Sequence, residues 1–310
     1  MQKLLDRAVN EVGTVLLGKE RQVRLALCCL VSGGHLLLED LPGMGKTTLS
    51  HALAKVLGLQ YRRVQFTSDL LPGDILGASI FDRPTNQFKF LPGPVFTQVL
   101  LADEINRSTP KTQSALLEAM AEQQVTIDGQ TRPLPQPFFV IATQNPLTQA
   151  GTFPLPESQL DRFLMRLSLG YPDPSAERRL LSGEDAYKQL QKLQQCTTPE
   201  QLQKLQNAVA TVHASEQLLD YVQRLIAYTR NGPGFAFGLS PRGALALLRS
   251  AKAWALMNGR GHVVPEDVQI VLAPVAEHRL HAAVDNTRSM GDHVGGGALV
   301  EQLLRKVAVV

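Results

Sequence analysis

Residues 36–48 read LLLEDLPGMGKTT: an apolar run, a loop that contains two glycines, and a Lys-Thr pair. A helix-forming stretch follows at residues 47–57. A strand, a glycine-containing loop and a helix in this order can cradle a polyphosphate, because backbone N–H groups point into the loop and the helix N-terminus adds positive potential. The strict motif has glycine where this chain has Asp40, whereas Gly43 and Gly45, the glycines nearest the phosphates, are present. The stretch therefore predicts a nucleotide-binding domain of the α/β class.

Two side chains at the end of this loop have expected roles. Lys46 is expected to reach the β- and γ-phosphates, and the hydroxyl of Thr47 is expected to bind Mg²⁺. The residues expected to bind the nucleotide are Leu41, Pro42, Gly43, Met44, Gly45, Lys46, Thr47, Thr48 and, from a later strand, Asp103.

Two later strands end in polar side chains that suit the same site. Residues 99–104 read VLLADE, and ligands of α/β sheets bind at the carboxyl ends of strands. Asp103 is therefore expected to hold Mg²⁺, and Glu104 to orient or deprotonate the attacking water; the alternative is that both acids cap the next helix. The strand at 138–142 is followed by Asn145, whose amide could hydrogen-bond the water or the γ-phosphate. On its own, an Asn before a proline indicates a turn.

Strand and helix patterns alternate in the first half of the chain, which predicts βαβ units and a mostly parallel sheet. The predicted strands are residues 35–38, 63–66, 99–102 and 138–142. Two further segments, 81–88 and 125–130, are predicted hairpins, the second because it runs into an Asp-Gly pair.

The patterns change after a proline-rich break at residues 171–174 and become helical almost throughout. We therefore predict two domains, an α/β domain over residues 1–172 and an all-helical domain over residues 173–310.

Composition disfavours several classes of function. The chain has 31 Lys and Arg against 28 Asp and Glu, and aromatic residues make up 5%, which disfavours nucleic acid as a partner. The longest apolar run, residues 25–31, is far shorter than the roughly 18 residues of a membrane span. Three cysteines support neither a disulfide framework nor a four-ligand zinc site. Because residues 1–7 also lack the pattern of a secretory signal, we expect a cytoplasmic protein with no membrane span.

Together the motifs resemble those of AAA+ ATPases, and closely those of the MoxR family, over nearly the whole chain. The segments that carry the resemblance are 17–20 (LGKE), 39–47 (EDLPGMGKT), 102–107 (ADEINR), 111–120 (KTQSALLEAM), 142–146 (ATQNP) and 160–163 (LDRF). In this family an acidic residue in place of the first loop glycine is familiar. The resemblance implies a P-loop αβα nucleotide-binding domain with a mostly parallel sheet, followed by an all-α lid.

The resemblance also implies roles for two arginines. Arg162 resembles the arginine finger that reaches the γ-phosphate held by a neighbouring subunit, and Arg166 is its competitor for this role. Arg242, in the Ser-Pro-Arg segment 240–242, resembles sensor two, a lid arginine that touches the same phosphate in cis or in trans. Both roles suit the permanently charged, planar guanidinium. The expected catalytic residues are therefore Glu104, Asn145, Arg162 and Arg242.

As a function, the resemblance implies Mg²⁺-dependent ATP hydrolysis, with ATP and ADP as the bound nucleotides, in a homo-oligomer that forms a hexameric ring. Hydrolysis is expected to drive chaperone-like remodelling or maturation of partner proteins, including complex assembly and metal or cofactor insertion. A partner with a von Willebrand A-type (VWA) domain is implied, and the client is not specified. The alternatives are the ATPase subunit of a magnesium or cobalt chelatase, a nucleic-acid motor, and a nucleotide-bound scaffold that does not hydrolyse.

Overall fold

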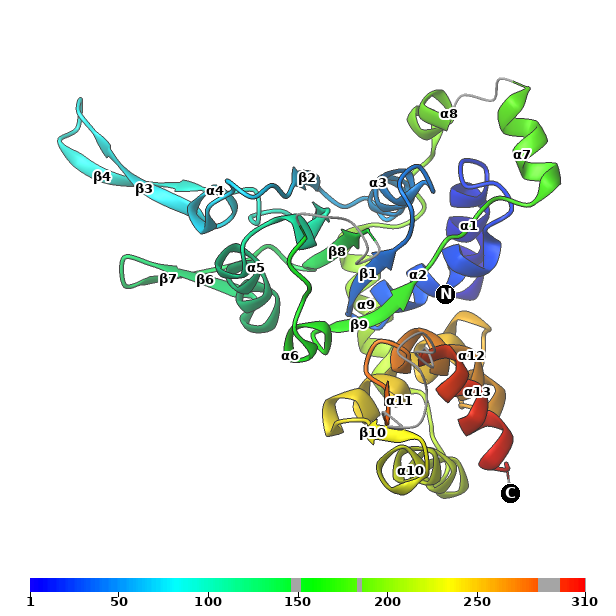
Figure 1. Ribbon diagram of the computed structural model, residues 1–310. Helices are drawn as coiled ribbons and strands as arrows, with labels where there is room; N and C mark the ends of the chain where they lie inside the picture. The colour runs from blue at the N-terminus through cyan, green and yellow to red at the C-terminus, as the bar shows by residue number, and fades with distance from the viewer. Residues whose placement is uncertain (146–151, 183–185, 284–295, 310) are drawn as a thin grey trace.

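The centre of the molecule is a parallel β-sheet (Figure 1). The structure is a computed structural model, and it describes residues 1–145, 152–182, 186–283 and 296–309. The strands, in spatial order, are β2 (Tyr61–Gln65), β5 (Val99–Asp103), β8 (Phe139–Gln144), β1 (His35–Glu39) and β9 (Phe163–Leu167). Every neighbouring pair is parallel, so the carboxyl ends of β1, β5 and β8 meet at one edge of the sheet.

The mostly parallel sheet expected from the sequence is confirmed, and each of the predicted strands is present within two residues of its expected bounds. The edge strand β9 was not predicted. Its sequence, FLMRL, has a half-buried arginine in an otherwise apolar run, which weakens the strand pattern.

Helices cover both faces of the sheet, because successive strand residues point to opposite sides. Leu36, Leu38 and Leu101 belong to one core, which includes residues of α1 (Gln2–Gly13), α2 (Glu20–Val31) and α3 (Lys46–Val56). Leu37, Leu100 and Ala102 belong to a second core on the other face. That core is closed by α4 (Pro72–Leu76) and α5 (Pro110–Glu122). The result is the expected αβα arrangement.

Two antiparallel hairpins project from one side of this body (Figure 1). The first joins β3 (Gly77–Asp82) to β4 (Gln87–Pro92), and the second joins β6 (Gln124–Ile127) to β7 (Gln130–Pro133). In the second turn, Asp128 and Gly129 both have positive φ, 52° and 72°, as a two-residue hairpin loop requires. Both predicted hairpins are confirmed.

The chain beyond β9 is mainly helical, as expected. Its elements are α7 (Pro174–Leu181), α8 (Ala186–Lys192), α9 (Pro199–Thr211), α10 (Glu216–Asn231), α11 (Pro241–Met257), α12 (Pro265–Ala276) and α13 (Gly296–Lys306). A short antiparallel pair, β10 (Phe235–Phe237) with β11 (His281–Ala282), accompanies them, and the sequence did not indicate it. The short elements η1 (Ile105–Arg107) and α6 (Glu157–Leu160) precede β9. The domain boundary at residue 172 stays a prediction.

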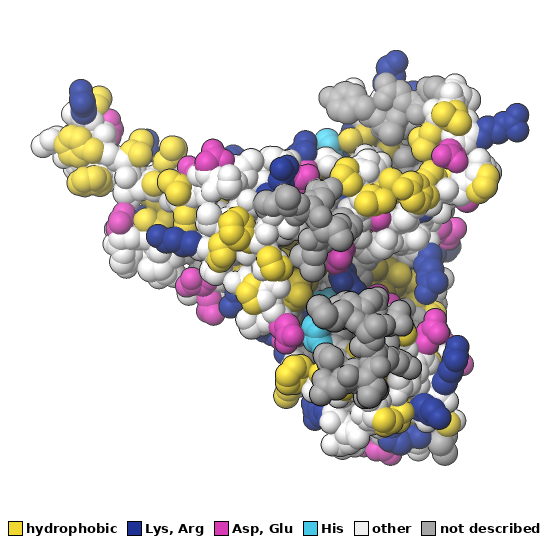
Figure 2. Space-filling view, in the orientation of Figure 1, with side chains coloured by type: hydrophobic (Ala, Val, Ile, Leu, Met, Phe, Trp, Pro, Cys, Tyr) yellow, Lys and Arg dark blue, Asp and Glu magenta, His cyan; other side chains and the backbone are white. Residues whose placement is uncertain are grey.

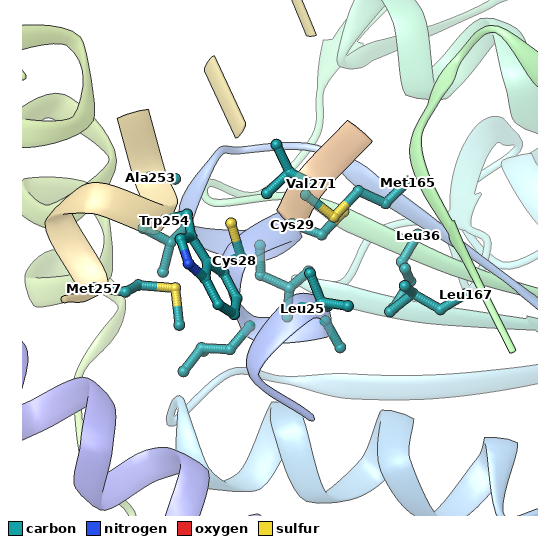
Figure 3. Packing of buried hydrophobic residues seen from close by; sticks show 14 of the residues in the cluster. Leu25, Cys28, Cys29, Leu36, Met165, Leu167, Ala253, Trp254, Met257 and Val271 are labelled. Carbon is teal, nitrogen blue, oxygen red and sulfur yellow. The ribbon is translucent and has the colours of Figure 1, made fainter. Parts of the chain in front are cut away.

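The helix α2 lies between the sheet and the lid helices and is buried on both sides (Figure 3). Cys28 lies beside Trp254 of α11, and its thiol donates to the carbonyl oxygen of Ser250, 3.5 Å away. Cys29, its neighbour, lies on the side of Met165 in β9. Burial raises the pKa of Cys28 to about 12, so this thiol stays protonated and packs as an apolar group. One apolar core therefore joins the sheet to the lid through α2.

None of the helices that the structure describes is long and apolar enough to cross a membrane.

Candidate active site

The phosphate loop joins the carboxyl end of β1 to α3. Gly43 and Gly45 have φ angles of 85° and 88°, and Gly45 is the N-cap of α3. Non-glycine residues are strained at such φ angles. A Cβ at either position would meet no atom within 4 Å, so glycine is required here by the backbone conformation and not by a lack of space. Thr47 and Thr48 lie half-buried in the first turn of α3, next to the loop.

Asp40 departs from the strict loop motif, and the structure gives a physical reason for it. Its Oδ2 atom accepts the backbone N–H groups of Leu169, at 2.5 Å, and Gly170, at 2.8 Å. The hydroxyl of Ser168 donates to the same oxygen at 3.1 Å. Glycine has no side chain to make these contacts, so the aspartate ties the start of the phosphate loop to the chain just after β9.

The ammonium of Lys46 lies where the ends of β1 and β8 meet. It donates to the carbonyl oxygens of Asp40 and Leu41, the latter at 3.2 Å, and to Oδ1 of Asn145, also at 3.2 Å. Burial lowers the pKa of Lys46, and the carboxylates of Asp40, Asp103 and others nearby act in the opposite direction. The group is thus a cation surrounded by acceptors at the position where a phosphate would bind.

The carboxylate of Asp103 is buried at the end of β5. Thr143 of β8 donates its hydroxyl to Oδ1 at 2.6 Å, and Arg63 of β2 donates to Oδ2 at 2.6 Å. The other candidate ligand, Thr47, also offers oxygen, which is the donor type that Mg²⁺ prefers. The carboxylate of Asp103 and the hydroxyl of Thr47 therefore supply oxygen donors that fit a bound Mg²⁺, and the contact with Arg63 shows that the carboxylate is placed to receive a cation.

Glu104 lies directly beyond β5 with a left-handed backbone, φ 56°, an uncommon conformation for a non-glycine residue that is often found at functional sites. Its N–H donates to the hydroxyl of Thr143 at 2.8 Å. Asn145 donates to Glu104 Oε1 at 3.0 Å, and Gln65 donates to Oε2 at 2.8 Å. Lys46, Asn145 and Glu104 therefore form one hydrogen-bonded chain.

Sequence reasoning missed four side chains in this region: Arg63, Gln65, Arg107 and Thr143. Arg107 donates to Glu104 Oε2 at 3.1 Å. Two of them could have been found from their place at strand ends. Gln65 is the last residue of β2 and Thr143 lies near the end of β8, and both strands are neighbours of β5, which ends at the acidic pair.

The two arginines expected at the γ-phosphate lie elsewhere. Arg162 and Arg242 line a cavity of about 540 Å³ together with Gly34 and His35, at the amino end of β1, and we call it the arginine cavity. The phosphate loop follows the carboxyl end of the same strand, roughly 13 Å away at 3.3 Å per residue. In the described part of the chain, neither guanidinium has a hydrogen-bonding or ion-pair partner. The structure therefore brings these two arginines together and separates them from Lys46.

Arg166, the competitor for the finger role, lies on β9 opposite Leu37. Its guanidinium pairs with Glu39 at 3.0 Å and with Glu277, after α12, at 3.7 Å. Arg166 is thus occupied inside its own subunit, on the phosphate-loop side of β9.

Two family models match this chain. One, described as "ATPase family associated with various cellular activities (AAA)", matches residues 35–165, which include the phosphate loop, the acidic strand end and Arg162. The other, described as "AAA lid domain", matches residues 227–294, which include Arg242.

Known proteins match nearly the full chain. Uncharacterized protein YeaC of Bacillus subtilis is 45% identical over 90% of this chain and 88% of its own length. Chaperone MoxR1 of Mycobacterium tuberculosis is 39% identical over 98% of this chain and 82% of its own length. A solved structure from Cytophaga hutchinsonii, of a protein assigned as an ATPase, is 38% identical with a TM-score of 0.88. The match covers 100% of this chain and 96% of that one.

Proposed function

This chain belongs to the MoxR family of AAA+ ATPases and hydrolyses ATP, and we propose that it does so in a ring of identical subunits to remodel partner proteins. In this proposal each nucleotide is held by the phosphate loop of one subunit and is approached by the arginine cavity of its neighbour.

The separation of the phosphate loop from the arginines carries the proposal. Lys46 lies beyond the carboxyl end of β1, whereas Arg162 and Arg242 line the cavity at its amino end. With this packing, one subunit cannot direct both groups at the same phosphate. A neighbour in a ring can do so, because its Arg162 and Arg242 line a cavity and their guanidinium groups have no partner among the residues that the structure describes. This arrangement favours sensor two acting in trans, as the finger does.

Hydrolysis then uses the groups at the strand ends. Mg²⁺, held by Thr47 and Asp103, would neutralise phosphate charge when bound. Lys46 binds the phosphates, and Glu104 orients the attacking water and accepts its proton. Asn145 contacts both side chains, at 3.2 Å and 3.0 Å, so it couples the phosphate position to the base.

Remodelling requires a surface that contacts a client. The β3–β4 hairpin carries exposed apolar side chains far from the nucleotide site, including Phe81 and Phe88 (Figure 2). We propose that this hairpin contacts the client, that a VWA-domain protein is the partner, and that the ring has six subunits.

We also infer a cytoplasmic location, since Cys28, Cys29 and Cys196 are all free thiols.

Complementation between two inactive variants tests hydrolysis in trans. Lys46→Ala removes nucleotide binding but keeps the arginines, and Arg162→Ala keeps the phosphate loop but removes the finger. Each homo-oligomer should lose about 10³-fold or more in ATP turnover. Mixed oligomers should recover a measurable fraction of the parent rate, because some interfaces pair an intact loop with an intact arginine cavity.

The control is a mixture of Lys46→Ala with the double variant Lys46→Ala/Arg162→Ala, which contains no intact phosphate loop. It should stay inactive. If the first mixture shows no more activity than this control although the subunits co-assemble, the proposal of hydrolysis in trans is wrong.

A further inference from the structure

Arg279, which follows α12, has a side chain that is 5% exposed and a guanidinium that is bonded through all three nitrogens. Its Nε donates to Oδ1 of Asp161 at 2.7 Å. Its Nη2 donates to the carbonyl oxygens of Asp161 at 3.1 Å and Phe163 at 2.6 Å. Its Nη1 donates to the carbonyl oxygens of Leu164, at 3.2 Å, and Val275. One side chain of the lid region thus holds a short stretch of the sheet domain.

The stretch that Arg279 holds contains the expected arginine finger. Its contacts reach the residues directly before and after Arg162, and none of them involves the guanidinium of Arg162 itself. The backbone of Arg162 is therefore fixed on both sides, while its charged group faces the cavity. Such an arrangement limits the directions in which the side chain of Arg162 can point, and Arg279 does not itself contact the guanidinium of Arg162.

The second oxygen of the same carboxylate reaches the element that carries Arg242. Ser240 donates its hydroxyl to Oδ2 of Asp161 at 3.4 Å. Ser240 is the N-cap of α11, and its hydroxyl accepts the N–H of Gly243 at 3.0 Å. Arg242 lies between these two residues, in the first turn of α11. Asp161 therefore links the backbone that carries Arg162 to the helix end that carries Arg242.

We propose that Arg279, through Asp161, is a positioning residue for hydrolysis in trans, fixing Arg162 and Arg242 relative to each other so that both reach one phosphate of the neighbouring subunit. The role rests on the function proposed above. It gives the lid a task in its neighbour's active site and predicts that loosening Arg279 lowers turnover without weakening nucleotide binding in the same subunit.

A role confined to stability is the competing explanation, since a buried arginine that loses its partners is costly to the fold. The chain offers a matched control. Arg260 pairs with buried Asp267 through two contacts, Nη1 to Oδ2 at 2.7 Å and Nη2 to Oδ1 at 2.5 Å, and Arg260 does not line the arginine cavity. Lysine at either position keeps the charge but loses the planar fork.

The first measurement compares Arg279→Lys with Arg260→Lys in the full-length oligomer. Because misplacing a catalytic group by about 1 Å costs on the order of 100-fold, Arg279→Lys should lower kcat by about 10- to 100-fold. KM for ATP should not change. Arg260→Lys should lower the unfolding temperature and leave kcat at the parent value when assayed well below that temperature. Equal kcat for Arg279→Lys and Arg260→Lys overturns the positioning role.

The second measurement asks which subunit the defect belongs to. In the complementing mixture, Arg279→Lys is added either to the Lys46→Ala subunit, which supplies only arginines, or to the Arg162→Ala subunit, which supplies only a phosphate loop. The recovered rate should fall only in the first case. An equal fall in both cases indicates a structural defect and overturns the role of Arg279.

Failure of the underlying function gives a different result, because the unmodified complementing pair would then recover no activity, and the positioning role falls with it. If Arg279→Lys does not fold, Ser240→Ala replaces it in both measurements, since it releases the same carboxylate from the other side. It should lower the recovered rate in the same subunit-specific way, and a symmetric loss overturns the role.

Discussion

The guanidinium of Arg63 donates to Oδ2 of Asp103 at 2.6 Å through Nη2 and at 3.0 Å through Nε. Arg63 lies on β2 and Asp103 ends the neighbouring strand β5, so an internal cation contacts the carboxylate that is expected to hold Mg²⁺. Metal and guanidinium then compete for one group.

Arg63→Gln should therefore lower the Mg²⁺ concentration needed for tight nucleotide binding. A half-exposed ion pair is worth about 0–1 kcal/mol, so the decrease should be at most about fivefold. A Mg²⁺ titration of fluorescent-nucleotide binding measures it without turnover. Arg62→Gln is the control, because it removes the same charge from the adjacent strand position, whose side chain faces the other way. An unchanged or higher Mg²⁺ requirement in Arg63→Gln would contradict the competition.

Asp40→Gly restores the strict loop motif and should nevertheless destabilise the protein. The variant loses an acceptor for two backbone N–H groups and one hydroxyl after β9. Hydrogen bonds to charged groups contribute about 1.5–3 kcal/mol, so the free energy of unfolding should fall by about that amount. Urea unfolding measures the loss, and Asp40→Asn, which keeps an oxygen acceptor, should lose less. Equal stability of Asp40→Gly and the parent would show that these contacts contribute nothing.

Glu104→Gln should abolish turnover while ATP binding persists. Glutamine keeps an oxygen for the amide of Asn145 but cannot accept a proton from water. Loss of a general base costs about 10²–10⁴-fold in kcat, whereas the affinity for ATP should stay near that of the parent. Single-turnover phosphate release and equilibrium ATP binding separate the two effects. If Glu104→Gln hydrolyses ATP at the parent rate, Glu104 is not the base.

Much of the site could be predicted because its residues are adjacent in sequence to strand ends. Lys46, Glu104 and Asn145 each follow an apolar run, and parallel strands bring their carboxyl ends to one edge. The hairpins were predictable for a similar local reason, since turn residues such as Asp128 and Gly129 define them. Local patterns therefore indicated which side chains meet at the phosphate loop.

The arginine cavity could not be derived in this way, because it depends on how distant segments pack. Arg162 precedes β9, a strand whose pattern Arg166 interrupts, and Arg242 comes from a helix that packs against α2 on the far side of the core. Family resemblance named both arginines and implied that Arg162 acts on the neighbouring subunit, but it did not specify whether Arg242 acts in cis or in trans. Arg279 carries no local motif, and only its contacts with Asp161 in the folded chain indicate a role.

His35 should make stability depend on pH in mildly acidic solution. It is buried, its Nδ1 accepts the N–H of Val140 at 3.0 Å, and burial lowers its pKa to about 4 from the usual 6.5. Between these values the unfolded chain binds a proton that the folded protein does not. The free energy of unfolding should therefore fall as pH drops from about 6.5 towards 4, by up to about 1.4 kcal/mol per pH unit, and His35 should add no slope above pH 6.5.

Chemical denaturation of the parent and of His35→Gln at several pH values between 4.5 and 7.5 checks this prediction. The slope below pH 6.5 should be smaller in the variant but still present, because burial also lowers the pKa of His278 and that residue is retained. Identical slopes in the two proteins would show that His35 is not responsible.

The tip of the β3–β4 hairpin should contact the client. Phe88 is 76% exposed, and its ring lies 5.4 Å from that of Phe81 in an edge-to-face pair, so an apolar surface is held out into solvent. Phe88→Ser lies far from the nucleotide site and should change basal ATP turnover little, since exposed substitutions usually alter stability by less than about 0.5 kcal/mol. It should release proteins captured by the ATP-loaded Glu104→Gln trap.

The comparison is between Glu104→Gln and Glu104→Gln/Phe88→Ser, with retained proteins quantified by mass spectrometry. Leu181→Ser in the same background is the control, because Leu181 is 83% exposed but lies on α7, away from the hairpin. A VWA-domain protein lost only from the Phe88→Ser sample would support the assigned partner and surface, whereas equal retention in all three samples would exclude the hairpin tip as the client contact.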